Sequence, residues 1–278
     1  DMGNYTAQIE FTQRSNSTPV GEEITHLTDH YKVRLQGKKW SIVTGDVILR
    51  ENPLLSYRSS FTGNDLQPLG DISRGFQVKY RFNESTDFQF FKGERLFRDD
   101  RFTKAELGFR LSDRMIGSTA YMNRDSSQIL TVGTDYHLSS RFIIGMLGGY
   151  SLPDRSGVQS GSAMQIRSSL KTETTQLLGC IHWSEPTFEG VDRGKNGAVI
   201  STQFVPLSSL FLWGSYHVYK KTWLTSESDS SANISEFKTR NMLKLGKWMV
   251  LHGGYRQTDM NFSDGRRFEG KIVGLDEQ

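Results

Sequence analysis

The segment Ile129–Tyr150 constrains the fold more than any other part of the chain. In its first half apolar and polar side chains alternate, so that Leu130 and Val132 fall on one face while Asp135 and His137 fall on the other. A period of two predicts a β-strand, because successive side chains of a strand leave opposite faces. Because one face carries an aspartate and a histidine, we do not expect the strand to lie in the dry core of a sandwich.

The pair Ser139-Ser140 predicts a tight turn, after which a second strand returns from Arg141. Two strands of about ten residues have the length that a tilted strand needs to cross a bilayer. A hairpin that is apolar outside and polar inside is the repeating unit of a transmembrane barrel. The returning strand is apolar on both faces over Phe142–Leu147. We therefore expect a plug, a loop or a partner protein to cover it.

Segments in which apolar and polar side chains alternate recur along the whole chain, and their number predicts about 16 strands. The expected strands are residues 5–11, 31–36, 40–49, 75–82, 87–92, 105–111, 115–122, 129–138, 141–150, 164–170, 174–183, 197–205, 210–219, 234–243, 248–255 and 268–275. We treat residues 1–278 as one all-β domain, either complete or part of a longer chain.

The connections between these strands differ in length by parity. Short turns follow the even strands from the second onward, and longer segments such as Arg50–Ser73, Glu185–Asn196 and Arg256–Gly265 follow odd strands. In an up-and-down barrel all even connections lie at one rim and all odd ones at the other. Bacterial outer-membrane barrels have short periplasmic turns and longer outer loops, whereas a Greek-key sandwich has no reason to sort loops by parity.

Aromatic residues gather near both ends of the expected strands, as membrane interfaces favour. Those near short turns are Trp40, Tyr80, Phe82, Phe109, Tyr136, Phe142, Phe204 and Trp248. Those near longer connections are Phe97, Phe102, Tyr121, Tyr150, Trp183, Tyr219, Trp223, Tyr255 and Phe262. The same placement would arise if aromatic side chains plugged the ends of a soluble barrel, so the parity of the connections is the independent signal.

Composition excludes several other classes of protein. No apolar run approaches the 18 residues of a transmembrane helix. The aromatic content of 12% argues against disorder, and a net charge of +3 without a basic run argues against nucleic-acid binding. The single Cys180 allows no internal disulfide, and the scattered histidines predict no metal or other cofactor. The chain begins at Asp1 without a signal peptide, which predicts either its removal or a longer precursor.

The pattern seen best over Val132–Gly145 resembles that of bacterial outer-membrane β-barrels. This resemblance implies an outer-membrane location and a transmembrane antiparallel up-and-down barrel. It also implies contact with outer-membrane lipid and lipopolysaccharide, and with periplasmic or envelope proteins as further partners. Porins of 16 strands and the barrel domains of exopolysaccharide exporters are comparable in size, and Trp40–Tyr80 is loosely similar to usher-type secretion barrels. Unlike most porins, the chain lacks a terminal aromatic residue, and Arg50–Ser73 is not clearly acidic.

The polar faces of the expected strands predict a basic lumen, because bases outnumber Glu10, Glu106, Asp135 and Glu236 there. Such a wall favours anions. The expected lining residues are Lys32, Arg34, Lys79, Arg81, Arg110, Asp135, His137, Arg167, Lys171, Lys238 and Arg240. The alternative role of these charges is to brace the barrel as cross-strand pairs.

We expect an outer-membrane pore or export conduit that passes anionic solutes or polymers and does no chemistry. One alternative is a structural barrel that anchors a larger envelope complex. The other is an outer-membrane hydrolase that uses Ser215 and His217, which share a face two residues apart. Same-face pairs at this spacing arise often by chance in strands. The glycines Gly145, Gly148 and Gly149 follow no strand-to-helix context, so we expect them to allow close packing and not to bind phosphate.

Overall fold

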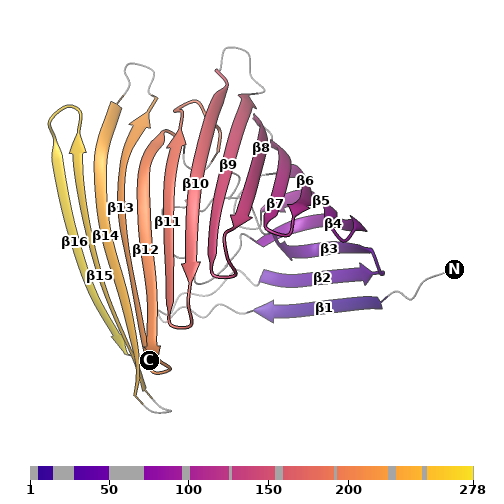
Figure 1. The fold of residues 1–278 in the computed structure, drawn as a ribbon, viewed down its shortest axis with the longest axis horizontal. Coiled ribbons are helices and arrows are strands. Elements are labelled where there is room, and N and C mark those ends of the chain that lie inside the picture. Colours follow the sequence, from indigo (N-terminus) through magenta and orange to yellow (C-terminus); the bar gives the residue numbers. More distant parts are fainter. Residues whose placement is uncertain are drawn as a thin grey trace.

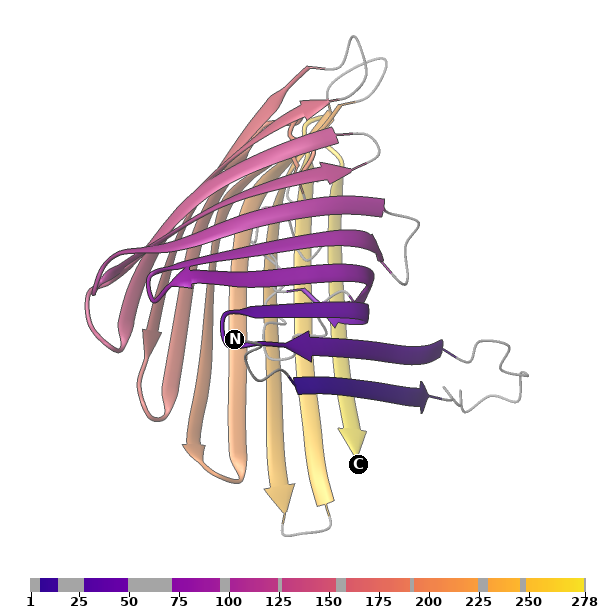
Figure 2. The ribbon, with the colours of Figure 1, turned by 90° about the vertical axis from the view of Figure 1, so that its right-hand side faces the viewer.

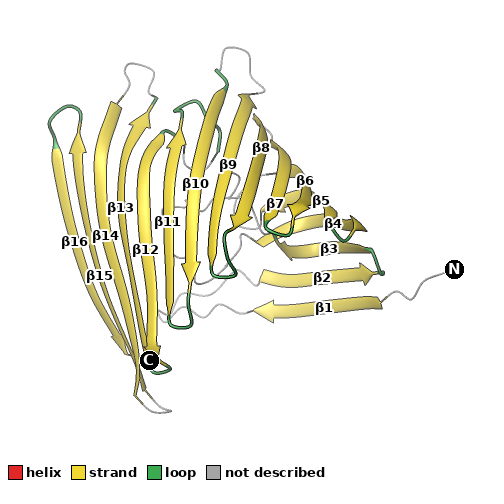
Figure 3. Ribbon diagram, in the orientation of Figure 1, coloured by secondary structure: helices red, strands yellow, loops and turns green. Residues whose placement is uncertain are grey.

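The computed structural model describes residues 6–14, 28–49, 72–95, 101–124, 127–153, 159–190, 193–224, 230–245 and 249–277. These residues form strands joined by turns and loops, and no helix among them is long and apolar enough to cross a membrane (Figure 3). The strands are β1 (Thr6–Arg14), β2 (Thr28–Gln36), β3 (Trp40–Ile48), β4 (Ile72–Asn83), β5 (Thr86–Arg95), β6 (Arg101–Ser112), β7 (Met115–Arg124), β8 (Ser127–His137), β9 (Phe142–Pro153), β10 (Gly161–Lys171), β11 (Thr175–Ser184), β12 (Lys195–Leu207), β13 (Leu210–Trp223), β14 (Ser230–Leu245), β15 (Met249–Phe262) and β16 (Arg267–Glu277).

Each strand pairs antiparallel with the next, in one 16-stranded sheet whose order is the chain order. This arrangement confirms the predicted all-β, up-and-down fold. The sheet is strongly twisted, so that β1–β3 run across the direction of β12–β16 (Figures 1 and 2). A right-handed twist between neighbouring strands accumulates in this way over a large sheet. The pairings of the described residues leave β1 and β16 at its two edges.

The strands agree with the predicted ones and extend past them, mostly toward the longer connections. The predicted turn at Ser139 is confirmed, because its Oγ accepts hydrogen bonds from the backbone N–H groups of Arg141 (3.2 Å) and Phe142 (3.1 Å). The predicted loop Arg256–Gly265 is wrong, since β15 continues to Phe262. Its outer-face residues Gln257, Asp259 and Asn261 are polar, so pairing with β14, and not an apolar outer face, keeps this segment in the sheet.

The register separates two faces of the sheet. Asp135 lies opposite Gly145, which lies opposite Arg167, and the same row continues through His217 and Glu236. We call the face that carries this row the inner face, and the opposite one the outer face. Apolar side chains such as Leu130 and Val132 are exposed on the outer face, as expected for a wall that contacts lipid.

The aromatic residues follow the predicted belts only in part. Near the short turns Trp40, Tyr80 and Phe204 are exposed on the outer face, and near the long loops Tyr121 and Trp183 are as well. Four of the predicted belt residues lie instead on the inner face, because the register of their strands turns them inward: Phe102, Tyr219, Trp223 and Phe262. Trp223 and Phe262 stack there with ring centroids 6.4 Å apart. Phe97 and Trp248 lie outside the described residues.

In the last strand, β16, apolar side chains face inward and charged side chains face outward, the reverse of the arrangement in β8. Gly270 of β16 lies opposite Thr258, whose hydroxyl donates to Glu236 on the inner face (3.4 Å). The alternation therefore turns Phe268 and Ile272 inward, although both are exposed, and it places charged side chains such as Glu269 on the outer face. At this edge of the sheet the rule of apolar outside and polar inside does not hold.

Candidate functional site: the inner face and the loop between β11 and β12

All the predicted lining residues lie on the inner face. The pairing places Lys32 and Arg34 opposite inner-face positions of β3, and the register continues without a change of face to β14. The residues brought together on this face are Lys32, Arg34, Lys79, Arg81, Arg110, Asp135, His137, Arg167, Lys171, Lys238 and Arg240.

Acidic residues of the inner face pair with some of these bases. Asp135 binds Arg167 through both carboxylate oxygens, each 2.7 Å from Nη2. Glu236 lies between Lys238 (2.7 Å) and Arg256 (2.6 Å). The bracing role considered for the charges is therefore real for these pairs, which join strands β8 to β10 and β14 to β15.

The Asp135–Arg167 pair explains one of the glycines of β9. The two side chains come from strands on either side of β9 and meet above Gly145. A Cβ atom at Gly145 would lie 2.2 Å from Oδ1 of Asp135 and 2.6 Å from Nε of Arg167. The absence of a side chain at this position is what lets the ion pair cross the strand.

Several of the predicted lining bases are exposed on the inner face near the short turns. Four of these form no ion pair with a residue that the structure describes: Arg81, Arg110, Lys171 and Arg240. We call these four residues the basic ring. Since Arg81, Arg110 and Lys171 lie within a few residues of the β4–β5, β6–β7 and β10–β11 turns, the ring marks the short-turn rim of the inner face.

Other inner-face bases escaped the sequence analysis. Lys104 pairs with Glu106 at 2.8 Å and is 1% exposed, and Arg124 is 8% exposed. Both lie just beyond the predicted ends of their strands, and Arg256 was assigned to a loop. The signal that could have found them is the period of two, continued past the last apolar residue of each strand.

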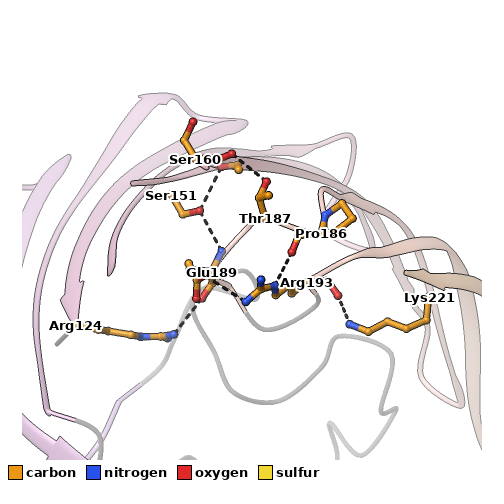
Figure 4. A network of polar contacts seen from close by, with 9 residues as sticks. Arg124, Ser151, Ser160, Pro186, Thr187, Glu189, Arg193 and Lys221 are labelled. Atoms are coloured by element: carbon orange, nitrogen blue, oxygen red, sulfur yellow. Dashed lines mark hydrogen bonds and ion pairs between the residues drawn. The ribbon is translucent and has the colours of Figure 1, made fainter. Parts of the chain in front are cut away.

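The loop between β11 and β12, Glu185–Gly194, folds onto the inner face, and the described strands curve around it (Figure 4). Its ends meet, because the Gly194 N–H donates to the Glu185 carbonyl oxygen at 3.2 Å. Gly194 has a φ of +66°, which a residue with a Cβ rarely adopts. The loop thus returns to the sheet where it left it, and its described residues 186–190 and 193 lie on the inner side of the wall.

Hydrogen bonds to four strands hold this loop in place, and Figure 4 shows those to β7, β9 and β13. The backbone N–H of Glu189 donates to Ser151 Oγ of β9 (3.0 Å), and the Glu189 carbonyl oxygen accepts from Arg124 of β7 (3.4 Å). The carboxylate of Glu185 accepts from the backbone and the hydroxyl of Ser162 of β10, and Lys221 of β13 donates to the Arg193 carbonyl oxygen. A loop with this many anchors has a defined position.

Within the loop, the Arg193 guanidinium binds one carboxylate and one backbone carbonyl group. Its Nη1 lies 3.2 Å from Oε1 of Glu189, and its Nε donates to the Pro186 carbonyl oxygen. The Arg193–Glu189 pair therefore cross-links two positions of the loop itself. Together with Arg124, which donates to the Glu189 carbonyl oxygen, this guanidinium makes the surroundings of Glu189 basic.

Phe188 anchors the loop by apolar contact. It is fully buried, in one cluster with Leu147, Ala163, Ile129 and Met122. Leu147 belongs to the stretch of β9 that is apolar on both faces. Of the three coverings expected for that stretch, the loop is the one that the structure shows.

Gly161 of β10 is expected to be essential for the position of the loop. A Cβ at Gly161 would lie 2.2 Å from the backbone N of Phe188 and 2.5 Å from its Cα. We expect Gly161→Val to displace the loop and to destabilise the fold by about 1–3 kcal/mol, as overpacking against a backbone does. Urea unfolding in detergent, followed by tryptophan fluorescence, measures this change.

Gly148→Val is the matched control, since a Cβ at Gly148 of β9 has only a carbonyl oxygen 3.9 Å away. It should leave the unfolding midpoint close to that of the unmodified chain. Equal effects of the two substitutions would show that the contact with Phe188 does not matter.

Ser215 and His217, the pair considered for hydrolysis, do meet on the inner face. His217 Nε2 lies 3.1 Å from Ser215 Oγ, but the side chains are 0% and 3% exposed, respectively. Glu236, opposite His217, places its carboxylate in ion pairs with Lys238 and Arg256. The described residues contain no group of His, Cys, Asp and Glu side chains that could hold a metal ion.

Comparison with known proteins finds similarity in structure alone. No family model matches the chain, and no curated protein matches it in sequence. OccK10 (OpdN) of Pseudomonas aeruginosa superposes with a TM-score of 0.63 at 11% identity, over 98% of this chain and 95% of that one. A BenF-like porin of Pseudomonas fluorescens Pf-5 gives 0.64 at 11% identity, over 100% and 88%. OprD of P. aeruginosa gives 0.60 at 8% identity, over 91% and 80%.

Proposed function

Since the chain has the fold of the OprD and Occ porin barrels, we propose that it is a pore in the bacterial outer membrane that passes small anionic solutes. The observation that carries this proposal is the basic ring on the inner face. Four exposed cations face the same side of the sheet without a carboxylate partner among the described residues. A wall lined by one sign of charge raises the local concentration of the opposite ion.

The ion pairs of the inner face increase the anion preference that we expect from the basic ring. Asp135 and Glu236 are engaged with Arg167, Lys238 and Arg256, so they offer little attraction to a passing cation. Paired charges also largely cancel beyond a few ångströms, whereas those of the ring act on solutes in the water-filled passage. The four cations of the basic ring are therefore the charges that we expect to act on a passing solute, and Asp87, opposite Arg81, is an exposed acid on the same face.

The loop Glu185–Gly194 favours small solutes over polymers. It occupies the inner side of the sheet and is tied to β7, β9, β10 and β13. A fixed obstruction of this kind narrows a passage and restricts what can pass by size. Of the two cargo classes expected from the sequence, it supports solutes of the size of carboxylates or phosphate esters.

Spanning a bilayer requires that the edges of the sheet be satisfied, because unpaired backbone groups are costly in lipid. β1 and β16 are the first and last strands of an even-numbered meander, so they run antiparallel and can pair with each other directly. We include this closure in the proposal. It leaves the inner face as the wall of a lumen.

Recording of single channels in planar bilayers tests the proposal against the structural alternative. A pore gives a stable conductance with a reversal potential that indicates anion preference. An anchoring barrel with a blocked lumen gives no conductance. A cation-preferring conductance would leave a pore but would refute the role of the basic ring.

The hydrolase alternative is tested by substitution of the buried serine. We expect Ser215→Ala to change neither esterase nor phospholipase activity of the purified chain, because Ser215 and His217 are closed off from substrate. Release of p-nitrophenol from short esters and of fatty acid from phospholipid are the two measurements. A hydrolytic activity that disappears in Ser215→Ala while the heat-modifiable gel mobility is kept would establish an enzyme instead.

A further inference from the structure

A basic pocket lies at the long-loop end of β4–β7. It has a volume of about 520 Å³, and its lining includes the cations Arg74, Lys92 and Arg101, a single carboxylate from Glu94, and the amide of Asn123. This volume is within the range of small-molecule sites and has room for a phosphorylated sugar. The pocket is separate from the basic ring, which lies near the short turns.

The register places these cations on the outer face. Lys92 pairs with Phe76, which is exposed among the lipid-facing side chains. Arg74 lies two residues before Phe76 on the same strand, and Arg101 lies opposite Glu94, itself paired with Arg74. Long loops of outer-membrane barrels project outside the cell. The pocket therefore opens on the outer wall, at the level where a bilayer exposes its outer head groups.

The three cations differ in how they are held. Arg74 is fixed, because it binds both oxygens of Asp46 (2.8 and 3.1 Å) and lies 5.0 Å above the ring of Tyr31. Arg101 and Glu94 are 3.8 Å apart and largely exposed, so their pairing is weak. Lys92 is exposed and has no ion pair with any residue that the structure describes.

An ammonium group on a lipid-facing wall is tolerated at the interface, where the anionic groups of lipids also lie. Lys92 is therefore the cation of this pocket that is available to an anionic head group. Arginine and lysine are the side chains that proteins use to bind phosphate, and Arg101 lies beside Lys92 in the pocket. Asn123 adds a neutral donor for the sugar or ester oxygens that surround a phosphate in a glycolipid.

We propose that this pocket binds a phosphate monoester of a phosphorylated glycolipid in the outer leaflet. The proposal rests on the outer-membrane location but not on anion passage, because the pocket is on the opposite face from the basic ring. Recovery of the chain in the outer-membrane fraction tests the location separately. Bound lipid at this point would attach β4–β7 to the leaflet and leave the lumen unobstructed.

The experiment compares Lys92→Gln with the unmodified full chain in detergent, by native mass spectrometry with lipid A that carries its phosphates. We expect Lys92→Gln to weaken binding about tenfold, as loss of one charge-assisted contact does. Lys220→Gln is the matched control, because Lys220 is exposed on the outer face near the long-loop end of β13. It should bind like the unmodified chain. Heat-modifiable mobility verifies that both variants fold.

Three results would overturn the proposal. The first is equal binding of phosphorylated lipid A by Lys92→Gln and the unmodified chain. The second is equal binding of lipid A from which the phosphates have been removed. The third is displacement of lipid A by inorganic phosphate at the same concentration, which would identify the free ion as the ligand. Unchanged conductance of Lys92→Gln would support the separation of this pocket from the pore.

Discussion

Replacement of residues 186–193 by an Asn-Gly turn is expected to raise the single-channel conductance severalfold. The loop projects from the wall between Glu185 and Gly194, whose backbones are already hydrogen-bonded at 3.2 Å. A two-residue Asn-Gly turn joins strand ends at such a separation, so the excision should leave β11 and β12 paired. What is lost is the obstruction of the lumen, and conductance in planar bilayers measures the change directly.

The excision variant also loses Phe188, which is buried against Leu147 and Ala163. A drop in stability should therefore accompany the wider pore, and retained heat-modifiable mobility is needed before the conductance is interpreted. Glu189→Gln is the control: it removes the carboxylate partner of Arg193 but keeps the backbone hydrogen bonds to Ser151 and Arg124. It should alter conductance much less. An excision variant that folds but conducts like the unmodified chain would refute the constricting role of the loop.

Reversal of charge in the basic ring is the second substitution with a large expected effect. Arg81→Glu, Arg110→Glu and Lys171→Glu together place three carboxylates where three exposed cations lie on the inner face. We expect the preference for chloride over potassium to turn into a preference for potassium, with a change in permeability ratio of at least about tenfold. Reversal potentials in a salt gradient give this ratio. The effect should decrease at high salt, because mobile ions screen the wall.

The matched control makes the same change in net charge on the outer face. Lys220 of β13 and Arg267 and Lys271 of β16 are exposed there. Their joint replacement by glutamate should leave the permeability ratio nearly unchanged. Similar shifts in both triple variants would mean that the overall charge of the chain, and not the lining, decides selectivity.

Much of the fold could be predicted because a strand between water and lipid must alternate polar and apolar side chains. In β8 the alternation of Leu130 and Val132 with Asp135 and His137 was sufficient to assign both faces, and the register confirms them. The parity of the connections then determined the up-and-down order. Prediction failed where the outer face loses its apolar residues: Gln257 and Asp259 are polar on that face, so the end of β15 was assigned to a loop.

The candidate site was predictable in part for the same reason. The bases of the lining could be assigned to one face from their spacing, but the ion pair between Asp135 and Arg167 spans two strands and depends on Gly145 between them. The residue pattern within a single strand cannot show an ion pair between two strands. Likewise, the position of Phe102 and Tyr219 near strand ends predicted a membrane belt, and only the register showed that they face inward.

The all-β class, the number and order of the strands, and the common face of the predicted lining charges follow from a period of two and from loop length, so the amino-acid sequence was enough to predict them. The fold of Glu185–Gly194 across the inner face was visible in the structure alone. That outcome depends on partners from β7, β9, β10 and β13, which lie tens of residues apart in the chain and meet only when the sheet curves. The same is true of the pocket around Lys92, since its lining comes from four neighbouring strands.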